Sequence, residues 1–259
     1  MGASDYRTIL GVRFFVRSAK AATQLALSGG LVVVPAAPAL VDLAEDGRYR
    51  EALVRSDLAI TDSGFMVLAW LLLRRERIQR ISGLKYLRLL LEEPALKSTK
   101  TVLWVVPTPK SRERTLAWLR ERGFAVEADD FYVAPMYPRD EIIDPELLAL
   151  VCARRPAHVV IALGGGVQEK LGLHLRDHTP HRPAIHCIGA ALAFLTGEQV
   201  AIPRWADALL LGWLFRCISQ PRRFVPRYWK ARKLLPLLVR YGEQLPELQR
   251  ASAERLLAD

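Results

Sequence analysis

The chain has 259 residues, of which 51% are hydrophobic and 25% are charged, so it is long enough to bury a core and is not an intrinsically disordered protein. It carries 37 Lys and Arg against 27 Asp and Glu, and this net charge of +10 indicates an anionic partner: a nucleic acid, a phosphorylated small molecule or an anionic membrane. Its three cysteines, Cys152, Cys187 and Cys217, are too few and too scattered for a disulfide framework or a zinc ribbon.

Strand and helix signals alternate along the first hundred residues. In chain order we expect a strand at 31–34, a loop at 35–39, a helix at 41–54, a strand at 58–60 and helices at 65–73 and 85–91. The strands are short β-branched or apolar runs, and the helices carry apolar residues at helical spacing. The run 65–73 is apolar all round, which predicts a buried helix, and it has about half of the roughly 20 residues that a membrane-spanning helix needs.

The alternation continues in the second half of the chain. We expect strands at 101–106, 124–127, 158–163 and 184–188, a loop at 107–111, and helices at 112–122, 144–154 and 168–176. Strands that alternate with helices are typical of a parallel sheet covered on both faces. The sequence therefore predicts an α/β fold with a mostly parallel, Rossmann-like sheet.

The composition changes after about residue 203. Between Trp213 and Arg240 the chain has eight basic residues, no acidic residue and five interleaved aromatic residues. We therefore expect an α/β core over 1–203 and a basic, aromatic helical appendage over 204–259. Such an appendage suits an anionic membrane surface, a nucleic acid whose bases stack on aromatic rings, or simply a solvated helix pair packed on the core.

A glycine-rich turn follows the predicted strand 158–163 and opens the next helix, with the sequence Gly-Gly-Gly-Val-Gln-Glu over 164–169. The backbone N–H groups of such a turn, at the positive end of a helix, favour a phosphate group. Gln168 and Glu169 would then bind polar groups of a ligand. The alternative is a plain tight turn in which Glu169 complements the helix dipole.

Asp62 follows the predicted strand 58–60, and ligands of open α/β sheets bind beyond the carboxyl ends of the strands. A carboxylate there can act as a general base toward a hydroxyl nucleophile, or can simply form a turn or cap a helix. Arg80 stands shortly before Gly83, in a turn that suits a phosphate group, although an ordinary surface arginine is the alternative.

Five motifs in order carry a family resemblance. They are Ile9-Leu-Gly-Val12, Ser56-Asp-Leu-Ala-Ile-Thr-Asp62, Arg80-Ile-Ser-Gly83, the 164–169 turn, and Trp213-Leu-Phe-Arg216 with Gln220-Pro-Arg-Arg223 and Arg227-Tyr228. In this order and spacing they resemble the WecG/TagA/CpsF glycosyltransferase family, from about residue 8 to residue 230. The resemblance implies a GT-E type fold. It also implies an inverting enzyme that transfers a hexose or N-acetylhexosamine from a UDP-sugar to a polyprenyl-diphosphate-linked sugar, for bacterial cell-surface polysaccharides.

The resemblance also implies roles for single residues. Asp62 matches the catalytic base, and Arg80 matches an arginine near the diphosphate. The substrate-binding set would further include Gly164, Gly165, Gln168 and Glu169 for the nucleotide-sugar, and Arg216, Arg222, Arg223 and Arg227 for the lipid diphosphate and the membrane. The resemblance implies neither a metal nor another cofactor, no nucleic-acid partner, association into homo-oligomers, and a cytoplasmic protein that is peripheral on the inner face of the plasma membrane.

The chain departs from the family's pattern at two places near the expected substrates. Residues 35–38 read Pro-Ala-Ala-Pro where the family has Thr-x-Asn-Pro, and Ser63 stands where the family has Gly after the Asp. The donor sugar therefore stays open. Two other functions stay open as well: another nucleotide-sugar-binding enzyme, or a degenerate, non-catalytic module that binds a membrane or a nucleic acid.

Overall fold

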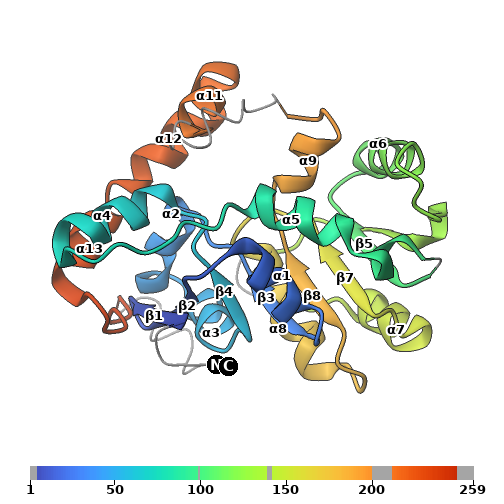
Figure 1. The fold of residues 1–259 in the computed structure, drawn as a ribbon, viewed down its shortest axis with the longest axis horizontal. Helices are drawn as coiled ribbons and strands as arrows, with labels where there is room; N and C mark the ends of the chain where they lie inside the picture. Colours follow the sequence, from blue (N-terminus) through green and yellow to red (C-terminus); the bar gives the residue numbers. More distant parts are fainter. Residues whose placement is uncertain (1–4, 99, 139–141, 200–211, 250–259) are drawn as a thin grey trace.

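The computed structural model describes residues 5–98, 100–138, 142–199 and 212–249. Within them eight strands form one sheet in the order β1-β2-β4-β3-β8-β7-β5-β6. The strands are β1 (Tyr6–Ile9), β2 (Val12–Phe15), β3 (Gly30–Val33), β4 (Leu58–Ile60), β5 (Val102–Val106), β6 (Phe131–Val133), β7 (His158–Ile161) and β8 (Ala184–Cys187). β1 is antiparallel to β2 and all other neighbours are parallel, so the predicted α/β fold is confirmed (Figure 1).

Helices cover both faces of this sheet. They are α1 (Ala19–Ala26), α2 (Ala37–Leu40), α3 (Gly47–Val54), α4 (Gly64–Arg74), α5 (Gly83–Glu92), α6 (Pro109–Arg120), α7 (Pro145–Arg154), α8 (Val167–His178), α9 (Ala191–Leu195), α11 (Gly212–Ser219), α12 (Pro221–Ala231) and α13 (Leu234–Tyr241). Alternate strand residues point to opposite faces: Leu31 and Val33 join the cluster under α3, α4, α7, α8 and α13, whereas Val32 joins the cluster under α1, α5, α6 and α9. The central strands are buried on both faces, which explains their continuous apolar runs.

Side-chain caps decide where several helices begin. Ser63 accepts a hydrogen bond from the N–H of Met66 at the start of α4, and Ser82 accepts one from Lys85 at the start of α5. The helices α3, α6 and α7 begin in the same way, at Asp46, Thr108 and Asp144. Each such cap contributes about 1 kcal/mol of stability.

Four predictions of local structure are wrong. Residues 124–127 form no strand, because the chain turns through Gly123 (φ +77°) and a 3-10 turn at Ala128–Asp130, and β6 begins only at Phe131. The expected loops at 35–39 and 107–111 already contain the first turns of α2 and α6, since Pro38 and Pro109 occupy first-turn positions. The expected helix 41–54 is divided into a 3-10 turn at Val41–Ala44 and α3, which Asp46 caps.

The C-terminal helices pack against the core. Ala231, Leu234 and Leu238 belong to the same apolar cluster as the strand residues, and Lys230 makes ion pairs with Asp42 and Glu45. The boundary predicted near residue 203 lies outside the described residues. In the part of the chain that the structure describes, each helix is too short or too polar to cross a bilayer.

Candidate active site

The candidate site lies at the carboxyl edge of the sheet. Here the chain leaves β3 toward α2 on one face and leaves the neighbouring β8 toward α9 on the other. Adjacent strands whose connections diverge in this way leave a crevice between them, which is where open α/β sheets bind ligands. The loops after β4 and β7 reach the same edge, since these strands run parallel to β3 and β8.

Asp62 is held in the loop after β4 by the segment that leads into α5. Its backbone carbonyl accepts a hydrogen bond from Nε of Arg80 (2.8 Å), and its Oδ1 accepts one from the N–H of Gly83 (2.9 Å). The Nη2 atom of Arg80 lies 4.0 Å from the same Oδ1. The side chain of Asp62 is still 27% exposed and that of Arg80 is 22% exposed, so both groups can contact a ligand.

Thr61 ties that segment to the end of β4. Its hydroxyl donates to the carbonyl of Gln79 (2.6 Å), and its own carbonyl accepts from the N–H of Ile81 (3.1 Å). The structure thus brings Asp62 and Arg80 together although 18 residues separate them. Thr61 is not among the predicted site residues, although a polar residue directly after an apolar strand is a signal that marks it.

Two helices begin beside Asp62. The helix α4 starts at Gly64 and α5 at Gly83, and the N–H groups of a first helical turn favour a nearby anion. Gly83 is needed on steric grounds, because a Cβ there would lie 2.7 Å from Cγ1 of Val34 at the end of β3. The Asp62 carboxylate, the Arg80 guanidinium and the start of α5 therefore share one small region, which suits a hydroxyl group next to a phosphate group.

The glycine-rich turn after β7 presents backbone to solvent. Gly164 and Gly165 are exposed, and a Cβ added at Gly164 would have no neighbouring atom within 4 Å. Gln168 and Glu169, in contrast, are 2% and 1% exposed. The turn thus offers its glycines, rather than these two side chains, to a ligand.

Gln168 and Glu169 bind the backbone of two loops. Oε1 of Gln168 accepts a hydrogen bond from the N–H of Gly189 (2.7 Å) after β8, and its Nε2 donates to Oε1 of Glu169 (3.0 Å). Oε2 of Glu169 accepts from the N–H of Gly166 (2.7 Å). The pair therefore joins the loop after β7 to the loop after β8. Gly189 was not among the predicted site residues, although a glycine directly after a strand is a detectable signal.

The C-terminal arginines are only partly described. Arg222 lies in the first turn of α12 and is exposed, whereas the side chains of Arg216, Arg223 and Arg227 lie outside what the structure describes. The helix α12 packs against α2, the helix that follows β3 at the carboxyl edge. This packing brings the C-terminal segment to the same side of the molecule as Asp62.

The chain matches a protein-family model. The model of the "Glycosyl transferase WecG/TagA/CpsF family" matches residues 7–250, which is nearly the whole chain. The chain belongs to this family. Membership makes it a glycosyltransferase of cell-surface polysaccharide synthesis, with a nucleotide-sugar donor and a lipid-linked acceptor. A search of curated proteins found no match.

Within the WecG/TagA/CpsF pattern, the departure at Ser63 has a structural explanation. The side chain of Ser63 is 4% exposed and its hydroxyl is used to cap α4, so it adds a helix cap rather than a polar group facing the site. The departure at 35–38 places Pro38 in the first turn of α2, where a missing N–H is tolerated. Among the described residues, no three His, Cys, Asp or Glu side chains lie close enough together to bind a metal ion.

Proposed function

We propose that this family member is an inverting enzyme that transfers a hexose or N-acetylhexosamine from a UDP-sugar to a polyprenyl-diphosphate-linked sugar. The observation that carries the proposal is the contact of Asp62 with Arg80 and with the first N–H of α5, at the diverging strand ends. A partly exposed carboxylate next to a guanidinium suits a reaction that moves a proton from a hydroxyl while a diphosphate departs.

In the proposed reaction the acceptor hydroxyl attacks the anomeric carbon of the donor. Its proton passes to the carboxylate of Asp62, the new bond forms between the acceptor oxygen and the anomeric carbon, and the bond from that carbon to the UDP oxygen breaks. A single displacement of this kind inverts the anomeric centre. Arg80 and the positive end of the α5 dipole stabilise the charge on the departing UDP, which is the role that a metal ion has in other enzymes.

The remaining predicted residues have supporting roles in this proposal. The exposed backbone of Gly164 and Gly165 lets the nucleotide approach closely, and Gln168 and Glu169 hold that turn from behind. Arg216, Arg222, Arg223 and Arg227 would meet the lipid diphosphate and anionic headgroups. The proposal thus places the enzyme at the inner face of the plasma membrane, where the lipid-linked acceptor is presented.

A donor screen tests the proposal. The purified chain is mixed with a panel of UDP-sugars and a short-chain polyprenyl-diphosphate-sugar, in EDTA, and UDP release and product mass are measured. We expect acceptor-dependent release with one donor, and a product whose anomeric configuration, determined by NMR, is opposite to that of the donor. A retained configuration, or a strict need for a divalent cation, would contradict the mechanism. Neither turnover nor UDP binding would favour a non-catalytic binding protein.

A further inference from the structure

The helix α4 begins two residues after Asp62, and the prediction that residues 65–73 form a buried helix is wrong, because the described residues leave one of its apolar faces exposed. Phe65, Leu68 and Leu72 are 42%, 47% and 73% exposed and repeat at the spacing of one helix face. Met66, Ala69 and Trp70 on the opposite face are buried in the core. Single exposed leucines are common, but a row of them along one helix marks an interaction surface.

The neighbouring C-terminal helices extend this surface. The helix α13 packs against α4, and both lie with α12 at the same end of the molecule (Figure 1). Their exposed apolar side chains are Val225 (49%) and Trp229 (64%) on α12 and Leu235 (43%) and Val239 (65%) on α13. The members of each pair are four residues apart, so each pair occupies one helix face. Exposed apolar side chains of α4, α12 and α13 therefore gather at one end of the molecule, and we refer to them together as the apolar patch.

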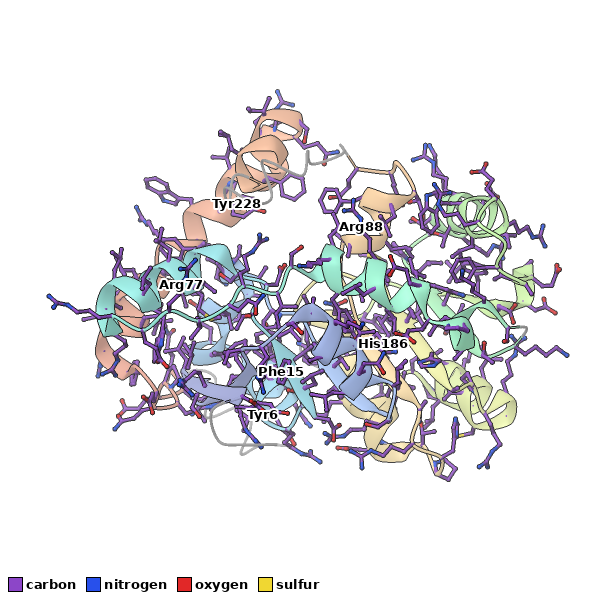
Figure 2. The ribbon with its side chains drawn as sticks, in the orientation of Figure 1. Tyr6, Phe15, Arg77, Arg88, His186 and Tyr228 are labelled. Atoms are coloured by element: carbon purple, nitrogen blue, oxygen red, sulfur yellow. The ribbon has the colours of Figure 1, made fainter. Side chains whose placement is uncertain are left out.

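Exposed cations lie on the same helices as this apolar patch. Arg74 is the last residue of α4, Arg75 and Arg77 follow it, and all three are exposed. Figure 2 shows Arg77 and Tyr228 at this end of the molecule. Among the side chains that the structure describes, the exposed cations of the C-terminal helices are Arg222, Arg232, Arg240 and Lys233, the last of which pairs with Glu45. The sequence has no acidic residue between 212 and 242. Glu76, the acidic residue among the α4 cations, is hydrogen-bonded to Arg7 and Trp70.

This combination favours an anionic lipid bilayer over a second copy of the chain. A symmetric contact between two copies would bring the same cations together, and their repulsion would oppose it. Lipid phosphates complement the cations, while the acyl boundary accepts the leucine and tryptophan side chains. The helix α4 has 11 residues, a length of about 16 Å, so it lies along the interface and does not cross the bilayer.

We propose that α4 inserts its Phe65–Leu72 face into the interface of an anionic membrane, beside α12 and α13, and thereby holds Asp62 at the headgroup layer. The inference rests on the proposed function, since the headgroup layer is where the diphosphate of a polyprenyl-linked acceptor lies. It extends the membrane-binding surface from the C-terminal helices to the helix that starts at the base. The acceptor then reaches Asp62 while its lipid chain stays in the bilayer.

The test compares two double variants of the full chain. Leu68→Gln with Leu72→Gln changes the α4 face, and Met136→Gln with Ile143→Gln is the matched control, since Met136 and Ile143 are 98% and 52% exposed in the β6–α7 connection. Each protein is sedimented with vesicles of phosphatidylglycerol and phosphatidylethanolamine. We expect the α4 variant to partition at least about tenfold more weakly than the unchanged chain, and the control to partition like the unchanged chain.

Three outcomes would overturn the inference: no binding of the unchanged chain to these vesicles, equal binding of the α4 variant, or equal binding of the unchanged chain to neutral phosphatidylcholine vesicles. Light scattering adds a fourth, because a dimer that the α4 substitutions dissociate would make this face a contact between copies. Turnover with a short-chain acceptor in solution is measured in parallel and is expected to persist in the α4 variant. If no donor gives turnover, the proposed function fails while the vesicle result still decides the role of α4.

Discussion

Two aspartates at opposite ends of β4 are used in different ways. Asp57, at the amino edge of the sheet, accepts hydrogen bonds from the N–H of Leu31 (2.8 Å) and from Arg182 (2.5 Å), and it pairs with Arg176. Asp62, at the carboxyl edge, accepts one from Gly83 and lies 4.0 Å from Arg80. The two side chains are similarly exposed, at 29% and 27%, but both oxygens of Asp57 are engaged in joining β3, β4 and the end of α8, whereas among the described residues Asp62 accepts hydrogen bonds through Oδ1 alone.

The glycines at the two edges show the same contrast. A Cβ at Gly30 would lie 2.6 Å from Cγ of Asp57, and one at Gly29 would lie 2.5 Å from the carbonyl oxygen of Arg182. A Cβ at Gly164 would meet no atom within 4 Å. At the amino edge glycine allows the protein to pack against itself, and at the carboxyl edge it leaves room for another molecule. Glycine therefore contributes to the stability of the fold at the amino edge and leaves space for a ligand at the carboxyl edge.

The largest effect is expected when each aspartate loses its charge. Asp62→Asn removes the proton acceptor, so turnover should fall by about 10³-fold, while the unfolding midpoint should stay close to that of the unchanged chain. Asp57→Asn should instead destabilise the fold by about 1 kcal/mol and leave the turnover of the folded fraction nearly unchanged. Steady-state UDP release and urea unfolding measure the two quantities.

An exposed carboxylate provides the control for that pair. Asp129→Asn should change neither turnover nor stability, because this residue is exposed at the far edge of the sheet, beside β6. If Asp57→Asn reduced the turnover of folded protein as strongly as Asp62→Asn, the division of roles between the two ends of β4 would be wrong.

The glycines allow a second test of the contrast between the two edges. Gly30→Ala should cost about 2–3 kcal/mol, because it combines a steric overlap with a φ of +101° that alanine rarely adopts. Gly164→Ala should leave the free energy of unfolding within about 0.5 kcal/mol and raise the KM for the donor, since the methyl group points into open space. Unfolding in urea and donor titrations measure these effects. An unstable Gly164→Ala protein would mean that this turn is packed after all.

Much of the arrangement of strands around the candidate site can be predicted from local sequence. The β-branched runs predicted at 31–34 and 184–188 correspond to β3 and β8, and the strand predicted at 58–60 ends next to Asp62 as expected. Their continuous apolar character reflects burial on both faces, which is why short windows suffice to find them. The alternation of strands and helices then brings Asp62 and the glycine-rich turn to one edge without further information.

The predictions that were wrong or missing concern features that depend on contacts between residues distant in the sequence. Residues 124–127 and Phe131–Val133 are both short apolar runs, and only pairing with β5 decides that the second is the strand. The hairpin of β1 and β2 was not predicted, because its polar residues break the apolar pattern of a buried strand. A glutamine and a glutamate after a glycine-rich turn look the same whether they face a ligand or, as here, the backbone of Gly166 and Gly189.

The interior between the two edges holds a polar chain that should make stability depend on pH. The hydroxyl of Tyr86 lies 2.7 Å from Nδ1 of His186, whose Nε2 lies 3.2 Å from Nδ1 of His158, in the core where Figure 2 labels His186. Burial raises the pKa of the Tyr86 phenol, so Tyr86 donates, and His186 must then be neutral in order to accept. Burial also lowers the pKa values of both histidines, that of His186 most strongly.

Histidines that are kept neutral contribute stability above their unfolded pKa of about 6.5 and lose it as the pH falls toward the lowered folded values. The free energy of unfolding should therefore decrease below pH 6.5, by up to about 1.4 kcal/mol per pH unit for each such histidine. Urea unfolding between pH 7.5 and 5 measures this slope. Tyr86→Phe with His186→Leu should reduce it, while His178→Gln, at an exposed position, should not. If the double variant showed the same pH dependence of the free energy of unfolding as the unchanged chain, the acid sensitivity would come from other groups.

The smallest expected effect concerns the departure next to Asp62. Because the hydroxyl of Ser63 caps α4 and is buried, Ser63→Ala should cost about 1 kcal/mol, whereas Ser63→Gly, which restores the family's usual residue, should cost only a few tenths. Both variants should keep the donor preference of the unchanged chain, because the hydroxyl faces the N–H of Met66. Thermal unfolding and the donor panel measure this. A changed preference in Ser63→Gly would show that this hydroxyl helps to select the sugar, and the carboxyl edge would then discriminate substrates through a group that also begins α4.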